Sequence, residues 1–221
     1  MHSATKCGHG PHRNRTHNGI VHELASILRN AGCFVSIEDP AYTCELPTGN
    51  IRPDIVIHNP NVIGYPANIS KVMVDVSVSS YTYMANTGPV PTVILSRASL
   101  KKVKSTPMDI LQANYKAKED GYSTYFEKIR RPDYAIVPFI LSSAGAIHSD
   151  SAEFLSEIAS HGASLHELPK SNMEKYYIRR IIFQLFRGIA GAILGKQMHK
   201  YLPAPDYTFD PDFIRCESPL I

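Results

Sequence analysis

Two aspartates in neighbouring apolar segments are the residues best suited to chemistry in this chain of 221 residues. Asp54 follows a proline at the start of "DIVIH", and Asp75 lies at the centre of "VMVDVSV". An ionised carboxylate moved out of water needs a cation or hydrogen-bond donors beside it. Two or three carboxylates, together with water and phosphate oxygens, are the ligands that Mg²⁺ prefers. The pattern therefore predicts a divalent cation at Asp54 and Asp75, with Glu23 as a third ligand.

Each acid also has an interpretation without a metal. Asp54 can simply start a turn after Pro53, and Asp75 can be a core acid that is satisfied by hydrogen bonds alone. Glu23 can be an ordinary glutamate on the surface of a helix. These alternatives stay open on the sequence.

The elements around the acids are predicted as one helix and three strands. Apolar residues at helical spacing indicate a helix that Asn18 caps and Gly32 ends. Strands are expected in "CFVSIE", in "DIVIH" and in residues 72–78, the last two as antiparallel neighbours, while "DPAYTCELPTGN" is rich in turn residues. Valines alternate along residues 72–78, so Asp75 should point to the opposite face of the sheet.

The second half of the chain adds further helices and a strand. A helix is expected from Met108 through "DILQANYKAKEDGYSTYFEKI", then a strand in residues 134–141. A short helix in "DSAEFLSEIAS" and a long one in "MEKYYIRRIIFQLFRGIAGAILG" follow. This order predicts an α/β domain over residues 18–200, between a polar arm rich in histidine and cysteine (residues 1–17) and an irregular tail (residues 201–221).

Lys118 is the basic residue whose helical position is informative. It falls in the same stripe as Leu111, Tyr115 and Tyr122, whereas Lys116 does not. A lysine in an apolar stripe either meets an anion or extends past its neighbours to solvent. Both interpretations remain open.

Other basic residues could contact a polyanion. Clusters occur in the last long helix and in "SLKKVK". Such charge runs are often only a solvated face, but they are also suited to phosphate binding. The candidate nucleic-acid contacts are Arg179, Arg180, Arg187, Lys101 and Lys102.

The start of the chain holds a second group of possible metal ligands. Cys7, His9, His12 and His17 could bind Zn²⁺, because thiolate and imidazole suit a tetrahedral zinc site. Their spacing matches no standard zinc finger, so a free polar arm is the alternative.

Composition limits the class of protein. A net charge of +3 tolerates a polyanionic partner without requiring one, and four widely separated cysteines predict no disulfide framework. The sequence shows neither a signal peptide nor an apolar stretch that would span a bilayer. We therefore expect an intracellular, soluble protein with no membrane partner.

The motifs "RTHNGIVHELASILRNAGCFVSIEDP", "RPDIVI" and "VDVSV", in this order, resemble the PD-(D/E)xK nuclease superfamily. Within it, the chain is most similar to the restriction-like endonuclease domain of reverse transcriptases from site-specific non-LTR retrotransposons. The resemblance extends into "VPFILSSAGAIHSDSAEFLSEIAS" and "RRIIFQLFRGIAGAIL". It implies a restriction-endonuclease-like core, with a central mixed sheet flanked by helices in the order helix-strand-strand-strand-helix-strand, plus C-terminal helices.

The resemblance also implies an activity. It suggests a DNA endonuclease dependent on Mg²⁺ or Mn²⁺, acting in the nucleus, with the reverse transcriptase or the RNA of the same element as further partners. Asp54 and Asp75 would hold the metal, with Glu23 as an additional ligand.

The chain departs from the superfamily pattern at one position. The usual lysine two residues after the second acid is replaced by Ser77, which carries no positive charge. In the retrotransposon type this lysine comes from the following helix, and the resemblance assigns that catalytic role to Lys118. The alternative is a catalytically silent nuclease fold that binds nucleic acid or a protein partner.

Overall fold

The structure is a computed structural model that describes residues 11–46, 49–79, 107–129 and 131–194. The helices in this part of the chain are α1 (Pro11–Asn30), α2 (Pro107–Ile129), α3 (Ser149–Leu165) and α4 (Lys170–Leu194). The strands are β1 (Val35–Ile37), β2 (Cys44–Leu46), β3 (Gly49–Ile51), β4 (Ile55–Ile57), β5 (Lys71–Ser79) and β6 (Tyr134–Ser142). Two 3₁₀ turns, Pro40–Tyr42 and Pro60–Ile63, complete the described elements.

Four strands form one mixed sheet in the order β1-β4-β5-β6. β1 and β5 both run antiparallel to β4, whereas β6 runs parallel to β5. The parallel step needs a crossover, and α2 lies in that connection. The predicted α/β class, with a mixed sheet flanked by helices, is confirmed.

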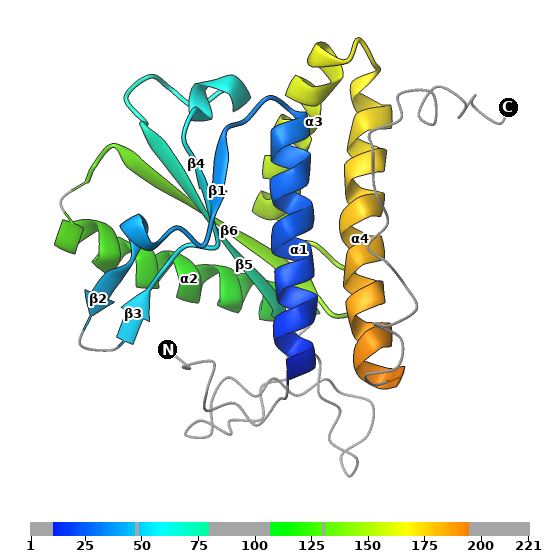
Figure 1. Ribbon diagram of the computed structural model, residues 1–221, viewed down its shortest axis with the longest axis horizontal. Helices are drawn as coiled ribbons and strands as arrows, with labels where there is room; N and C mark the ends of the chain where they lie inside the picture. Colours follow the sequence, from blue (N-terminus) through cyan, green and yellow to red (C-terminus); the bar gives the residue numbers. More distant parts are fainter. Residues whose placement is uncertain (1–10, 47–48, 80–106, 130, 195–221) are drawn as a thin grey trace, which may run out of the picture.

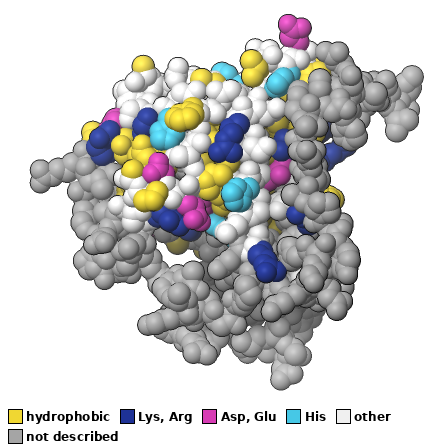
Figure 2. All heavy atoms as spheres, in the orientation of Figure 1, with side chains coloured by type: hydrophobic (Ala, Val, Ile, Leu, Met, Phe, Trp, Pro, Cys, Tyr) yellow, Lys and Arg dark blue, Asp and Glu magenta, His cyan; other side chains and the backbone are white. Residues whose placement is uncertain are grey.

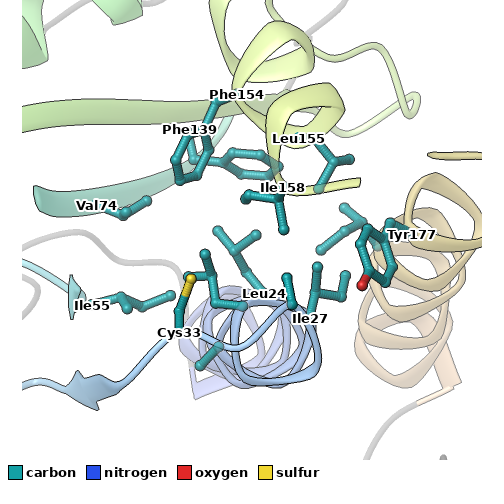
Figure 3. Close-up of a cluster of buried hydrophobic side chains, with 14 of the residues drawn as sticks. Leu24, Ile27, Cys33, Ile55, Val74, Phe139, Phe154, Leu155, Ile158 and Tyr177 are labelled. Atoms are coloured by element: carbon teal, nitrogen blue, oxygen red, sulfur yellow. The ribbon is translucent and has the colours of Figure 1, made fainter. Parts of the chain in front are cut away.

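Helices cover both faces of this sheet (Figure 1). The valine face of β5 belongs to the main core, which α1, α3 and α4 complete and in which Val74 lies among Leu24, Phe139 and Ile158 (Figure 3). The opposite face packs against α2 through a smaller buried cluster. Its members are Ile51, Met73, Tyr122 and Tyr125. Alternation along β5 thus gives one face to the core and the other to α2, as the valine pattern predicts.

α1 and α4 run side by side and approach closely (Figure 1). A Cβ on Gly188 would lie 2.5 Å from Oγ1 of Thr16, so a larger residue there would push the helices apart. Thr16 is only 7% exposed. This contact packs α1 against α4 at Thr16, ahead of Asn18, where the sequence predicts the start of the helix; α1 begins at Pro11.

The segment that is rich in turn residues contains a small hairpin. β2 and β3 pair antiparallel, with Cys44 opposite Ile51. The sequence did not predict β2 and β3, because "CEL" and "GNI" lie among turn residues and lack the apolar runs of β1 and β4. The hairpin lies next to α2, where the Tyr125 hydroxyl donates a 2.8 Å hydrogen bond to the carbonyl of Tyr42. In the described part of the chain, none of the helices is long and apolar enough to cross a membrane.

Candidate active site

Asp75 is paired with Lys118, a residue of the neighbouring helix. The Lys118 ammonium donates to both carboxylate oxygens of Asp75, at 2.9 Å to Oδ1 and 2.8 Å to Oδ2. Asp75 points from β5 toward α2 because it lies opposite the valine face, and the helical phase of Lys118 directs it down onto the sheet. The Asp75 side chain is 11% exposed and that of Lys118 36%. The buried carboxylate thus has its countercharge, and Lys118 does not simply extend to solvent.

Asp54 lies directly beside Asp75. The β4–β5 register pairs Ile55 with Val74, which places Asp54, one residue earlier, across from Asp75. The Asp54 amide donates to the carbonyl of Val74 at 3.1 Å, and its Oδ2 accepts the Val76 amide at 2.7 Å. The strand pairing therefore brings the two predicted carboxylates to one point on the α2 face of the sheet.

His17 completes this constellation from the first helix. Its Nε2 lies 3.2 Å from Oδ2 of Asp54 and 3.1 Å from the carbonyl oxygen of Val76. Since both partners are acceptors, Nε2 carries a proton and donates. Asp54 and His17 together satisfy the amide and the carbonyl of Val76, which lie beyond the end of the β4 pairing. The sequence places His17 among possible zinc ligands, because nothing in its spacing points to Asp54.

The pKa values of these groups are shifted by their proximity. Burial raises the pKa of Asp75 to about 6, because the charge of Asp54 adds to burial and Lys118 only partly opposes both. Burial alone would lower the pKa of His17, but the hydrogen bond and charge of Asp54 raise it to about 9. Burial opposes ionisation of Asp54 as well, yet His17 and the Val76 amide keep its pKa below the usual value. At neutral pH the cluster holds two carboxylates and two cations.

Tyr122 lies in the same cluster, one helical turn after Lys118 on α2. It is 2% exposed and packs against Met73, the neighbour of Asp75 two residues earlier on the same strand face. Its hydroxyl is buried close to Asp75, but it has no partner in good hydrogen-bond geometry among the residues that the structure describes. Burial and the charges of Asp75 and Asp54 raise the pKa of this hydroxyl far above its usual range. The sequence placed Tyr122 in the apolar stripe of its helix and gave no signal of a role at the site.

Glu23 is not part of this constellation. It is 8% exposed and accepts a hydrogen bond from Nε of Arg180 on α4, whose NH2 group also donates to the Ser26 hydroxyl at 3.0 Å. Within the described ranges, no group of three or more His, Cys, Asp or Glu is arranged to hold a metal ion. Glu23, the expected third ligand, is thus paired with Arg180, and the carboxylates of Asp54 and Asp75 remain as the candidate metal ligands.

These two carboxylates fit a hard divalent cation. Oδ2 of Asp54 is engaged by His17 and Val76, and Asp75 faces it across the strand pair. Burial and, to a smaller extent, the charge of Asp54 raise the pKa of Asp75, and a cation between the two carboxylates would offset their repulsion. A pair of oxygen ligands that keeps several waters on the ion is the arrangement Mg²⁺ commonly has.

The predicted nucleic-acid contacts fall in different environments. Arg180 is 5% exposed and bound to Glu23, so its guanidinium lies in the interior, which differs from the prediction that it can reach solvent or phosphate. Arg179 is exposed and Arg187 is half-buried. Lys101 and Lys102 lie outside the described residues. On the face shown in Figure 2, basic and acidic side chains are interspersed over the described surface.

Of the possible zinc ligands, only the side chain of His17 belongs to the part of the chain that the structure describes. Cys7 and His9 lie outside the described residues, and the side chain of His12, in the first turn of α1, does as well. His17 is bound to Asp54 and to the neighbouring Asn18, whose Oδ1 lies 3.2 Å from Nδ1 of His17. The zinc site therefore stays a prediction.

Comparisons with known proteins add no assignment to this geometry. A scan against protein-family models and a search of curated proteins both found no match. The functional argument consequently depends on the site itself.

Proposed function

We propose that the chain is a DNA endonuclease domain dependent on Mg²⁺ or Mn²⁺, of the PD-(D/E)xK type found in site-specific non-LTR retrotransposons. One observation carries this proposal: Lys118, from the helix after the second acid, contacts Asp75, and Asp54 lies beside them. An acid pair with a lysine is the set of groups that this class uses. Lys118 on α2 would thus supply the positive charge that Ser77, at the usual lysine position, lacks.

The arrangement of elements around the site supports the same proposal. The order of the elements that build the main sheet and its first helices is α1, β1, β4, β5, α2, β6. This agrees with the order that the resemblance implies, with the β2–β3 hairpin as an addition between β1 and β4. DNA, the reverse transcriptase or RNA of the same element, and a nuclear location belong to the proposal as well.

The residues of the chain have distinct tasks in this chemistry. The cation, when bound, would supply a Lewis acid for a phosphate oxygen and lower the pKa of a bound water. Asp54 and Asp75 would hold it, and His17 orients Asp54 through its Nε2 hydrogen bond. Lys118, with its side chain 36% exposed, is accessible enough to reach a phosphodiester and to stabilise the negative charge that develops there.

A catalytically silent nuclease fold is the second candidate, and one observation favours it. Asp75 already has a cation in Lys118, and Asp54 already has His17 and the Val76 amide. Buried carboxylates paired in this way can stabilise a fold without binding metal. Such a domain would bind nucleic acid or a protein partner and cleave nothing.

A plasmid-nicking assay separates the two candidates. Supercoiled DNA is incubated with the wild type in Mg²⁺, in Mn²⁺ and in EDTA, and the open-circle product is measured. An endonuclease nicks with either metal and not in EDTA, and the nearly isosteric Asp75→Asn variant loses the activity while circular dichroism shows that it remains folded. Absence of nicking by a folded wild type in both metals would favour the silent fold.

A further inference from the structure

The Tyr122 hydroxyl stands out because it is buried beside two carboxylates without a hydrogen bond. It makes none to any described residue, although Tyr122 is only 2% exposed. Leaving a buried hydroxyl unpaired costs free energy, and a native structure with such a group calls for a bound water, an ion or a functional role. Tyr125, one turn along the same helix, shows the ordinary outcome, since its hydroxyl donates to the carbonyl of Tyr42 at 2.8 Å.

The position of Tyr122 follows from the packing of α2 on β5. Lys118 and Tyr122 are four residues apart and share one helix face, and Lys118 reaches Asp75. The Tyr122 ring packs on Met73, which precedes Asp75 on the same face of β5. The hydroxyl is close enough to Asp75 and Asp54 for both charges to raise its pKa.

The phenol itself is a poor ligand for the proposed cation. A tyrosine hydroxyl carries its proton at neutral pH, because the ordinary pKa of a phenol is about 10. A neutral phenol does not compete with a carboxylate for Mg²⁺, but it donates and accepts hydrogen bonds. A water between Tyr122, Asp75 and Asp54 would have the two or more polar partners that a buried water needs.

We infer that Tyr122 is a positioning residue whose hydroxyl hydrogen-bonds a water ligand of the cation held by Asp54 and Asp75. This inference rests on the proposed function, because it assigns the hydroxyl to the same cation site. It explains why a tyrosine, and not a phenylalanine, occupies the apolar stripe of α2. Mg²⁺ and Mn²⁺ keep several waters, so a side chain that orients one of them strengthens binding without being a ligand.

The test compares Tyr122→Phe with Tyr125→Phe in the full chain. Both changes remove one buried hydroxyl from the same helix and the same cluster. In EDTA, Tyr122→Phe should keep or raise the melting temperature, by up to about 2 °C, because no hydrogen bond is lost. Tyr125→Phe should lower it by about 2 to 4 °C, because the bond to Tyr42 is lost.

Mn²⁺ binding, measured by calorimetry, gives the readout that a purely structural role would not change. Tyr122→Phe should weaken Mn²⁺ binding about 10-fold or more and slow nicking at limiting Mn²⁺, as the loss of groups around a metal site typically does. Tyr125→Phe should bind Mn²⁺ and nick DNA as the wild type does.

The possible results are distinguishable. A lower melting temperature for Tyr122→Phe in EDTA would mean that the hydroxyl bonds Asp75 directly, and it would overturn the inference. Wild-type Mn²⁺ affinity in Tyr122→Phe would overturn it as well, while leaving the proposed function intact. A wild type that binds Mn²⁺ but does not nick contradicts the proposed function alone, and one that does not bind Mn²⁺ contradicts both.

Discussion

Lys118 and Asp75 lie 43 residues apart in the chain, yet the ammonium of one is within 2.9 Å of both carboxylate oxygens of the other. The pair links the centre of β5 to the middle of α2. In the proposed nuclease, Lys118 would supply the positive charge that Ser77 on the strand lacks. A helix can deliver this charge because α2 packs directly on the face of β5 that carries Asp75.

Replacement of Lys118 should abolish most activity without removing the metal site. Lys118→Ala should lower nicking by roughly 100-fold or more, since loss of one charge-stabilising donor commonly costs this much. Mn²⁺ affinity should not fall, because lysine is not a ligand. Single-turnover nicking rates at saturating Mn²⁺ measure the effect.

Lys116→Ala is the matched control for this prediction. Lys116 lies on the same helix and is exposed. Its removal should leave the nicking rate unchanged. Equal and mild effects of the two substitutions would contradict the role of Lys118 and would direct attention to Lys71, whose ammonium donates to the carbonyl of His58 at 3.3 Å.

Neutralising Asp75 should not destabilise the metal-free protein. Its pKa is raised from 3.8 to about 6, so the ionised form is disfavoured in the folded state and its charge lowers stability above that range. Asp75→Asn should therefore keep or raise the melting temperature in EDTA at pH 7. The same variant should lose the stabilisation that Mn²⁺ gives the wild type. A clear fall of the melting temperature in EDTA would identify Asp75 as a structural acid.

The sequence predicted the parts of the site that follow from periodicity. Alternation along residues 72–78 oriented Asp75, and helical phase selected Lys118 over Lys116, because each pattern needs only local geometry. The antiparallel pairing of β4 and β5, also predicted, is what places Asp54 across from Asp75. Local rules sufficed for these three residues.

The contacts that the sequence did not predict depend on the packing of distant helices. His17 reaches Asp54 because α1 begins before Asn18 and runs along α4. Glu23 pairs with Arg180 where α1 and α4 pack together. No spacing rule relates residues 37 or 157 positions apart. The unpaired hydroxyl of Tyr122 is likewise visible only once the surroundings of its ring are known.

The Glu23–Arg180 pair should behave as a structural unit. Both side chains are at most 10% exposed, so removal of one leaves a buried charge without its partner. Arg180→Ala should destabilise the protein by about 3 kcal/mol or more in urea unfolding. A double change, Glu23→Gln with Arg180→Met, should cost less than Arg180→Ala alone, because no charge is then stranded. Equal costs would show that the charges are not coupled.

Arg179 is the neighbouring arginine on the exposed face of α4, and it tests nucleic-acid binding from the surface. Because its side chain is exposed, Arg179→Ala should change the melting temperature much less than Arg180→Ala does. If Arg179 contacts a phosphate, its removal should reduce the slope of log Kd against log salt by about one. An unchanged slope would exclude Arg179 from the DNA interface.

The stabilisation that His17 gives the metal-free protein should decrease as the pH rises. Its pKa is raised from 6.5 to about 9, so the imidazole ring binds its proton more tightly in the folded state than in the unfolded state. The resulting stabilisation is fully present below pH 6.5 and is lost as the pH passes about 9. His17→Gln keeps a side-chain donor for Asp54 but carries no charge. Urea unfolding in EDTA should therefore show a difference between wild type and His17→Gln that is large at pH 6.5 and shrinks by pH 9, whereas a constant difference would mean that His17 is neutral beside Asp54.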